Sequence, residues 1–417
     1  MFAHSSRKLL LLGGILSMVA LSACAAGGGS GGLTPAAKPS AIPLMTTTGP
    51  AMAASPAVAS DSPGRSATAK PKPTGSRTSA SSAVSAAHVP LPAAAIPGPT
   101  VFGFAAPEVL SDNQSTQVAQ LQQMKALGVT SIRVDADWYW TQLNGPDSFD
   151  WASLDQVASS LQQVGLTADF VIDGCPPWAA VSSAKGQEFA QPASPAEFAK
   201  FAGEVAARYG PKGVVKYFEI WNEPNIQRFW LPQPDVAAYS ADLIAAYAAI
   251  KAADPSAVVI SAGLSDAADT STSYDPRTFL EDMYAAGAKG SFDGVGDHPY
   301  SYPASPDNGL SGWSQMSATS PSLRSIMIEH GDSAKKIWIT EYGAPTTGSD
   351  SVSESDQSTE LVQAISQAQQ LSWIGSFYIY TWSDVSSGPS VDNGFGLLTD
   401  TNAQKPAYTA VSAALHK

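Results

Sequence analysis

The chain of 417 residues has little cysteine, little histidine and few basic side chains. Its two cysteines are Cys24 and Cys175, and once Cys24 is assigned to lipid attachment, as argued below, no internal disulfide can form. Of the five histidines only His298 lies in a motif, so a metal site has no support in the sequence. We therefore expect neither a metal nor another cofactor.

Basic residues are especially scarce beyond the N-terminal region. Seven of the 23 basic residues precede residue 99, together with Asp61, the one acidic residue there, so residues 99–417 hold 16 basic and 35 acidic side chains and a net charge of −19. Binding to nucleic acid rests on neutralising phosphates, and an acidic surface repels acidic chains. The sequence thus argues against nucleic acid as a partner and against a strongly acidic polysaccharide as a substrate.

The first residues have the pattern of a secretory signal. Two basic residues precede an apolar stretch, Leu9 to Ala23, that is too short and too interrupted by glycine for a membrane span but suits a signal-peptide core. It ends in Leu21-Ser22-Ala23-Cys24, which resembles the lipobox of bacterial lipoproteins, whose cysteine is acylated and becomes the new N-terminus. We predict a lipoprotein signal peptide at residues 1–23 and lipid attachment at Cys24. An ordinary secretory signal with an incidental cysteine is the alternative.

The next segment lacks aromatic residues. Residues 25–98 contain no Phe, Tyr or Trp and consist almost wholly of Ala, Ser, Gly, Pro and Thr. Such a segment cannot bury enough apolar area to offset its chain entropy, so residues 24–98 are predicted to be a lipidated, disordered tether of roughly 45 to 50 Å. The folded part would then lie in the cell envelope, anchored to the membrane by lipid and facing outside the cytoplasm.

Residues 99–417 have the size of one α/β barrel domain. Strand-like and helix-like segments alternate along them, which is the pattern of parallel strands joined by crossover helices. We predict a (β/α)8 TIM barrel after the signal peptide and linker, and we expect a monomer. The predicted strands are 101–104, 131–135, 167–172, 217–221, 258–261, 292–296, 337–340 and 376–380, and the predicted helices are 116–127, 154–164, 195–209, 236–253, 278–286, 322–330, 354–371 and 406–415.

Two glutamates follow buried strands of this predicted barrel. Glu223 closes the apolar run that begins at Tyr217, and Glu341 closes the run that begins at Ile337. Barrels keep their chemistry at the C-terminal ends of strands, and hydrolysis of a glycosidic bond needs two carboxyls, one acting as an acid and the other as a nucleophile or base. The alternatives are that Glu223 is a carboxylate at a helix N-terminus and that Glu341 is a structural partner of Arg133.

The motifs around these glutamates resemble those of the retaining glycoside hydrolases of clan A, and they are most similar to those of family thirty-nine, the β-xylosidase type. The resemblance spans residues 99–417. It is carried by Trp221-Asn222-Glu223-Pro224-Asn225, Thr340-Glu341-Tyr342-Gly343, Ile132-Arg133-Val134-Asp135, Asp297-His298-Pro299-Tyr300 and Tyr380-Thr381-Trp382.

The resemblance implies a role for each residue of these motifs. Glu223 would be the general acid/base and Glu341 the nucleophile. Arg133 and Tyr300 would hold Glu341 ionised and oriented. Asn222 would hydrogen-bond the sugar hydroxyl beside the anomeric carbon.

Two further motif residues would complete the sugar site. His298 would line the same subsite, and Trp382 would offer an apolar face beneath the sugar ring. The alternative for His298 is a hydrogen-bonded core histidine, and for Trp382 a place in the core.

Several tryptophans fall in predicted loops after strands, among them Trp138 and Trp230. We assign both to substrate binding, Trp230 as the best candidate for stacking on a sugar, although scattered tryptophans would merely pack the loops. Glu219 is expected to be a buried structural acid one layer below Glu223, with a disturbed pleat between them. Trp338 is expected to face the helices.

The sequence therefore predicts a retaining β-glycosidase that hydrolyses a neutral poly- or oligosaccharide by double displacement at the cell surface. A carbohydrate-binding lipoprotein without catalysis and a transglycosylase are the alternatives. The sugar, the linkage and the choice between exo and endo action stay open.

Overall fold

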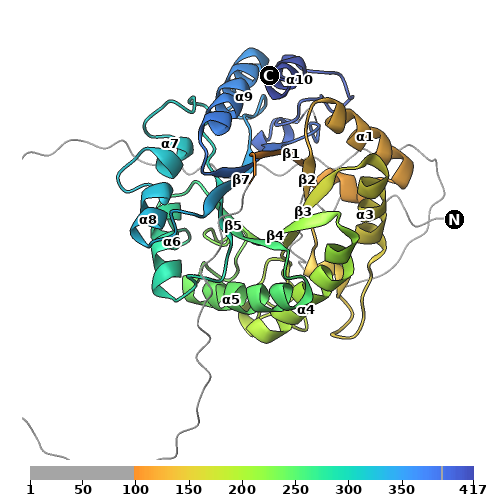
Figure 1. Ribbon diagram of the computed structural model, residues 1–417, viewed down its shortest axis with the longest axis vertical. Coiled ribbons are helices and arrows are strands. Elements are labelled where there is room, and N and C mark those ends of the chain that lie inside the picture. The colour runs from red at the N-terminus through yellow and green to blue at the C-terminus, as the bar shows by residue number, and fades with distance from the viewer. Residues whose placement is uncertain (1–97, 387) are drawn as a thin grey trace, which may run out of the picture. The chain divides into compact units, whose positions relative to one another are not determined.

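The computed structural model describes residues 98–386 and 388–417 (Figure 1). The predictions made for the signal peptide at residues 1–23, for lipid attachment at Cys24 and for the tether up to residue 97 lie outside the described residues.

Eight parallel strands close into one barrel in chain order, so that β1 pairs with both β2 and β8. The predicted TIM barrel is confirmed. Figure 1 looks into the ring of strands, with the helices around its outside. The strands are β1 (Val101–Ala105), β2 (Ser131–Asp135), β3 (Thr167–Ile172), β4 (Val215–Asn222), β5 (Val258–Ser265), β6 (Gly294–His298), β7 (Lys336–Tyr342) and β8 (Ile374–Tyr380).

Helices connect consecutive strands and cover the barrel. They are α1 (Gln114–Ala126), α2 (Trp138–Thr141), α3 (Ala152–Val164), α4 (Pro195–Tyr209), α5 (Val236–Ala253), α6 (Pro276–Ala285), α7 (Gly312–Ser317), α8 (Leu323–Glu329), α9 (Glu354–Gln370) and α10 (Pro406–Leu415). Local chemistry marks their starts: Pro195 suits the first turn of α4, and the Asp235 side chain caps α5 by accepting a hydrogen bond from the Ala238 N–H. Short 3-10 turns also occur at Pro107–Ser111, Ser182–Ala184, Gly210–Lys212 and Val391–Asn393.

One helix of the described part, α5, is long and apolar enough to cross a membrane. In the barrel it packs against α4 and β5 and buries Tyr239, Leu243 and Ile250. Its apolar composition therefore serves the packing of the barrel.

The end of β4 breaks the regular alternation of a strand. Trp221 and Glu223 both adopt left-handed backbone conformations, with φ of 72° and 45°. Trp221 turns outward, where its ring packs 4.8 Å from that of Trp230 and its Nε1 donates to the Phe229 carbonyl at 2.6 Å. The disturbed pleat expected from the sequence is confirmed, and it lets Asn222 and Glu223 follow one another at the mouth of the barrel.

The expected orientation of Trp338 is wrong. Its ring lies 4.9 Å from that of Tyr217, and because β7 and β4 are not neighbours, this contact crosses the inside of the barrel. Glycines on the flanking strands make the room: a Cβ at Gly294 or Gly375 would lie 2.4 or 2.6 Å from the Trp338 ring. The pairing of β7 with β8 then shifts register between Ile339 and Tyr342, next to Glu341.

Candidate active site

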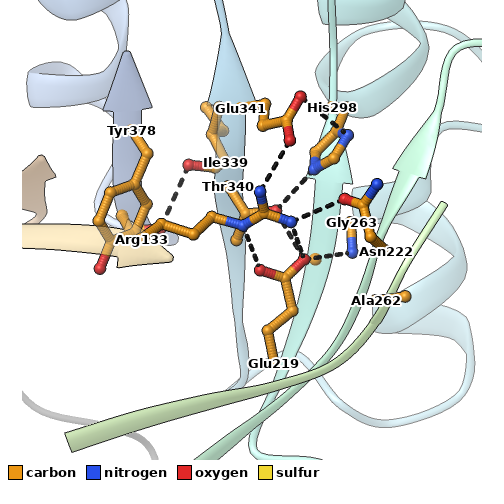
Figure 2. A network of polar contacts seen from close by, with 12 residues as sticks. Arg133, Glu219, Asn222, Ala262, Gly263, His298, Ile339, Thr340, Glu341 and Tyr378 are labelled. Atoms are coloured by element: carbon orange, nitrogen blue, oxygen red, sulfur yellow. Dashed lines mark hydrogen bonds and ion pairs between the residues drawn. The ribbon is translucent and has the colours of Figure 1, made fainter. Parts of the chain in front are cut away.

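Arg133 joins three strands at the mouth of the barrel (Figure 2). Its guanidinium donates to both oxygens of Glu219 (2.6 and 3.2 Å), to Oδ1 of Asn222 (2.8 Å) and to Oε1 of Glu341 (2.7 Å). Burial opposes the charge of Arg133, but the negative charges of Glu219 and Glu341 outweigh it and raise its pKa above the ordinary value. The arginine is thus a permanent cation under the site.

Glu219 lies wholly inside the barrel and, as expected, is a structural acid. Besides Arg133 it accepts hydrogen bonds from the Gly263 N–H (2.7 Å) and the Thr340 hydroxyl (3.0 Å). Both its oxygens are therefore occupied, and no surface of this carboxylate is left for a substrate.

Glu341 is held from two sides. Arg133 binds one oxygen, and the Tyr300 hydroxyl donates to the other at 2.8 Å. A cation and a hydroxyl donor both stabilise a carboxylate, which is the form a nucleophile requires. The side chain remains 14% exposed, so a substrate can reach it.

Glu223 faces His298, whose ring is buried. Nδ1 of His298 lies 3.0 Å from Oε1 of Glu223, and Nε2 lies 3.0 Å from the Thr340 hydroxyl. The Thr340 hydroxyl donates its one proton to Glu219, so Nε2 of His298 must donate to the Thr340 oxygen. Nδ1 is then free to accept a proton from a protonated Glu223 or, in the imidazolium, to donate one to the carboxylate.

His298 is therefore matched to both protonation states of Glu223. Burial disfavours the imidazolium, but the charge of Glu341 and the hydrogen bond with Glu223 raise the pKa of His298 overall. The ring has no exposed surface of its own, so His298 fits the alternative of a hydrogen-bonded core histidine, placed directly against Glu223.

The two glutamates face each other closely. One oxygen of each, together with a ring nitrogen of His298, all lie within 4.8 Å of one another. Pairs of carboxyls about 5 to 5.5 Å apart act by nucleophilic attack, whereas about 6.5 Å or more is needed to place a water between them. The same three groups have the spacing of metal ligands, but the Arg133 cation 2.7 Å from Glu341 opposes a metal there.

Three sequence assignments need correction. Trp138 is fully buried, stacked 5.8 Å from Phe201 of α4 and bonded through Nε1 to Gln142. Trp230 is fully buried between Trp221 and Tyr239. Neither ring is accessible to a sugar, because Trp138, at the start of α2, packs against α4, and Trp230 packs against Trp221 and Tyr239.

Trp382 is also buried, with 1% exposure, and packs edge-on 5.3 Å from Phe104. The aromatic residue of this motif that stays partly exposed is Tyr380, the last residue of β8. Burial and the charge of Glu341 both raise the pKa of Tyr380. Its place at the C-terminal end of a strand was the signal that could have singled it out.

A closed eight-stranded barrel with two facing glutamates at the ends of β4 and β7 defines a glycoside hydrolase of clan A. Residues 95–382 match the model of the family described as cellulase (glycosyl hydrolase family 5), and the chain belongs to this family. No sequence among the curated proteins matches it.

Solved structures share the fold. A family 39 glycoside hydrolase from the gut symbiont Bacteroides cellulosilyticus is 20% identical, with a TM-score of 0.60, covering 76% of this chain and 63% of that one. A monomeric β-xylosidase from Caulobacter crescentus is 22% identical, with a TM-score of 0.54, covering 75% and 66%. A family 5 enzyme from Streptomyces cattleya, in complex with GlcNAc, is 16% identical, with a TM-score of 0.55, covering 76% and 80%. The chain thus spans about two thirds of the length of the first two.

Proposed function

We propose that this protein is a retaining β-glycosidase that cleaves O-glycosidic bonds of a poly- or oligosaccharide by double displacement. The observation that carries the proposal is the close approach of two differently held carboxyls. Glu341 is fixed by a cation and a hydroxyl donor, while Glu223 has a histidine that can match either of its protonation states.

The reaction would run in two steps. Glu341 attacks the anomeric carbon, and Glu223 gives its proton to the leaving oxygen as the glycosidic bond breaks, which leaves a glycosyl ester on Glu341. A water then attacks the same carbon while Glu223 takes its proton, and Glu341 leaves as a carboxylate. Asn222, oriented by Arg133, would hold the sugar hydroxyl beside the reacting carbon.

The acceptor in the second step decides between hydrolysis and transglycosylation. A sugar hydroxyl could replace the water without any change in the roles of the two glutamates. We favour hydrolysis, because water needs no binding site of its own in the second step. A binding protein without catalysis is disfavoured, since both glutamates are present and face each other.

Removing the two carboxyls separately tests the proposal. Glu223→Ala should keep measurable activity on aryl β-glycosides with acidic phenol leaving groups, because these need no proton, and azide should accelerate it and yield a β-glycosyl azide. Glu341→Ala should be nearly inactive on every substrate, and any product rescued by azide should have the inverted configuration.

The products distinguish the possible outcomes. Leaving-group rescue at Glu341 and none at Glu223 would mean that the two roles are reversed. Unchanged activity in both variants would remove the glycosidase proposal. As a matched control, Glu329→Gln removes a carboxylate that is exposed at the end of α8 and should leave activity unchanged.

We further propose that the enzyme acts in the cell envelope as a lipid-anchored monomer. The support is the lipobox-like Leu21-Ser22-Ala23-Cys24 and the aromatic-free segment that follows it. Cys24→Ser should release the protein from membranes without altering its specific activity. Retention in the membrane fraction would overturn the proposed lipid attachment.

A further inference from the structure

A second group of carboxylates lies beside the catalytic pair, at the ends of β2 and β3. We call Asp135, Asp137, Asp173 and Glu188 the acidic rim. Asp135 ends β2, two residues after Arg133, and Asp173 directly follows β3. The Trp138 N–H binds the Asp173 carbonyl (2.7 Å) and the Cys175 N–H binds the Glu188 carbonyl (2.7 Å), so three separate segments converge here.

Asp173 is the member of the rim that points to a ligand. It is 4% exposed, yet its carboxylate accepts no hydrogen bond from any residue that the structure describes. Neither of its oxygens is sealed from solvent, so a ligand that enters the site can reach this carboxylate. A buried carboxylate left without a donor is unfavourable unless a ligand or solvent supplies one.

An aromatic side chain, Trp140, is bonded to two other members of the rim. Trp140 is 43% exposed, although its Nε1 donates to Glu188 (3.3 Å) and its backbone N–H donates to Asp137 (3.2 Å). Glu188 thus holds the indole and Asp137 holds the backbone of the same residue, while part of the ring stays open to solvent. A fixed, exposed indole is a surface on which a sugar ring can stack and toward which a cation is attracted.

The rim gathers four carboxyl groups and has no free cation among the described residues around it. Burial raises the pKa of Asp137 and Asp173, and each is raised further by neighbouring carboxylates of the rim. The one cation that acts on Asp173 is Arg133, whose hydrogen bonds are taken by Glu219, Asn222 and Glu341. A ligand with a positive charge would favour the ionised form of these carboxyls, which burial and the neighbouring carboxylates disfavour.

The spacing favours an ammonium group over a metal ion. Within residues 98–386 and 388–417, Glu223, His298 and Glu341 are the one group of His, Cys, Asp or Glu side chains spaced to hold a metal ion, with their ligand atoms within 4.8 Å of one another. The carboxylates of the rim do not form such a group. A metal needs several ligand oxygens around one point. An ammonium group needs acceptors in a few directions and tolerates wider spacing.

We propose that the acidic rim is a subsite for an amino sugar, and that Asp173 accepts a hydrogen bond from its free ammonium group while Trp140 contacts the ring. This deepens the proposed glycosidase function and rests on it, since the rim adjoins the catalytic glutamates. The substrate class is then a β-linked glycan that carries unacetylated amino groups. The net charge of −19 argues against acidic chains but is compatible with a cationic one, so this proposal replaces the neutral substrate expected from the sequence with a cationic one.

Binding to a catalytically disabled protein tests the subsite. In the Glu223→Gln background, calorimetry compares the β-1,4-linked tetramer of glucosamine with the same tetramer fully N-acetylated. The free-amine tetramer should bind about tenfold tighter or more, as expected for a charge-assisted hydrogen bond, and the difference should shrink as salt is added. Adding Asp173→Asn should remove most of the preference, whereas adding Glu329→Gln should leave it intact.

Each outcome decides one proposal. Equal affinity for the two tetramers, or no binding of either, overturns the amino-sugar subsite even if the Asp173 variant fails to fold, because that comparison needs no change at Asp173. An Asp173→Asn protein that folds and keeps the full preference overturns the role of Asp173. The glycosidase function is judged separately, by the aryl glycosides and the azide products, so the subsite can fail while the glycosidase stands.

Discussion

Replacing Arg133 by methionine tests the network that underlies the site. The change would remove two hydrogen bonds to Glu219, one to Asn222 and one to Glu341, and would leave Glu219 buried without its cation. Breaking a buried ion pair by removing one partner costs about 3 to 5 kcal/mol. For the 319 residues of the barrel region, an unfolding entropy of about 2.1 cal/mol/K per residue converts this into a fall in melting temperature of roughly 5 to 7 °C.

A second substitution separates the buried charge from the lost contacts. In Arg133→Met with Glu219→Gln, the amide oxygen can still accept from the Gly263 N–H and the Thr340 hydroxyl, but no charge remains unpaired. The double variant should therefore regain at least about 1 kcal/mol over Arg133→Met. Activity should not return, because Glu341 would still lack its cation.

Urea unfolding of wild type, both single variants and the double variant measures these energies, and initial rates on an aryl β-glycoside measure activity. A loss below about 1 kcal/mol in Arg133→Met would show that solvent reaches Glu219 and that the network is not buried. A double variant with restored activity would show that Arg133 acts on Glu219 and not on the nucleophile.

Two further predictions concern side chains around the barrel mouth. Trp138→Ala should destabilise the protein by about 3 to 5 kcal/mol in urea unfolding, because the Trp138 ring is buried. Trp140→Ala should change stability little, because the Trp140 ring is exposed. Equal losses in the two variants would contradict the assignment of Trp138 to the core. Burial raises the pKa of Glu108, which is bonded to the Thr381 hydroxyl, from 4.5 to about 7. Between these values the folded protein holds a proton that the unfolded chain has lost, so stability should fall as pH rises through this window. The fall should be less steep in Glu108→Gln. If the free energy of unfolding, measured at pH 5 and at pH 7, changes equally in wild type and in Glu108→Gln, the shift is refuted.

The sequence predicted the barrel well where the signal is long and regular. The helices Pro195–Tyr209, Val236–Ala253 and Pro406–Leu415 begin and end where predicted, since each runs for several turns of good helix-forming residues and has a clear start at a proline or an aspartate. The strands Ser131–Asp135 and Thr167–Ile172 also match. The helices α2 and α7 were missed, because four or six residues are too few to show a period.

The sequence predicted strand boundaries and the orientation of side chains less well. The sixth strand begins two residues later than predicted, at Gly294, and the ring of Phe292 packs against Tyr284 of α6. Trp338 was placed outward by simple alternation, which takes no account of the glycines on the neighbouring strands. Whether a tryptophan in a loop is exposed depends on how that loop folds over the outer layer, and a single local sequence carries little of that information.

The pairing of Arg133 with Glu219 has a consequence for synthesis. If Glu341 were replaced by glycine, Arg133 would keep three of its four hydrogen bonds, so the barrel would not be left with a stranded cation. Under the proposed double displacement, the vacated space would admit a glycosyl fluoride of α configuration in place of the ester intermediate, and Glu223 would remain to deprotonate an incoming sugar hydroxyl. A hydrolase with this arrangement can therefore be converted into a catalyst that builds β-linked oligosaccharides and cannot degrade what it has made.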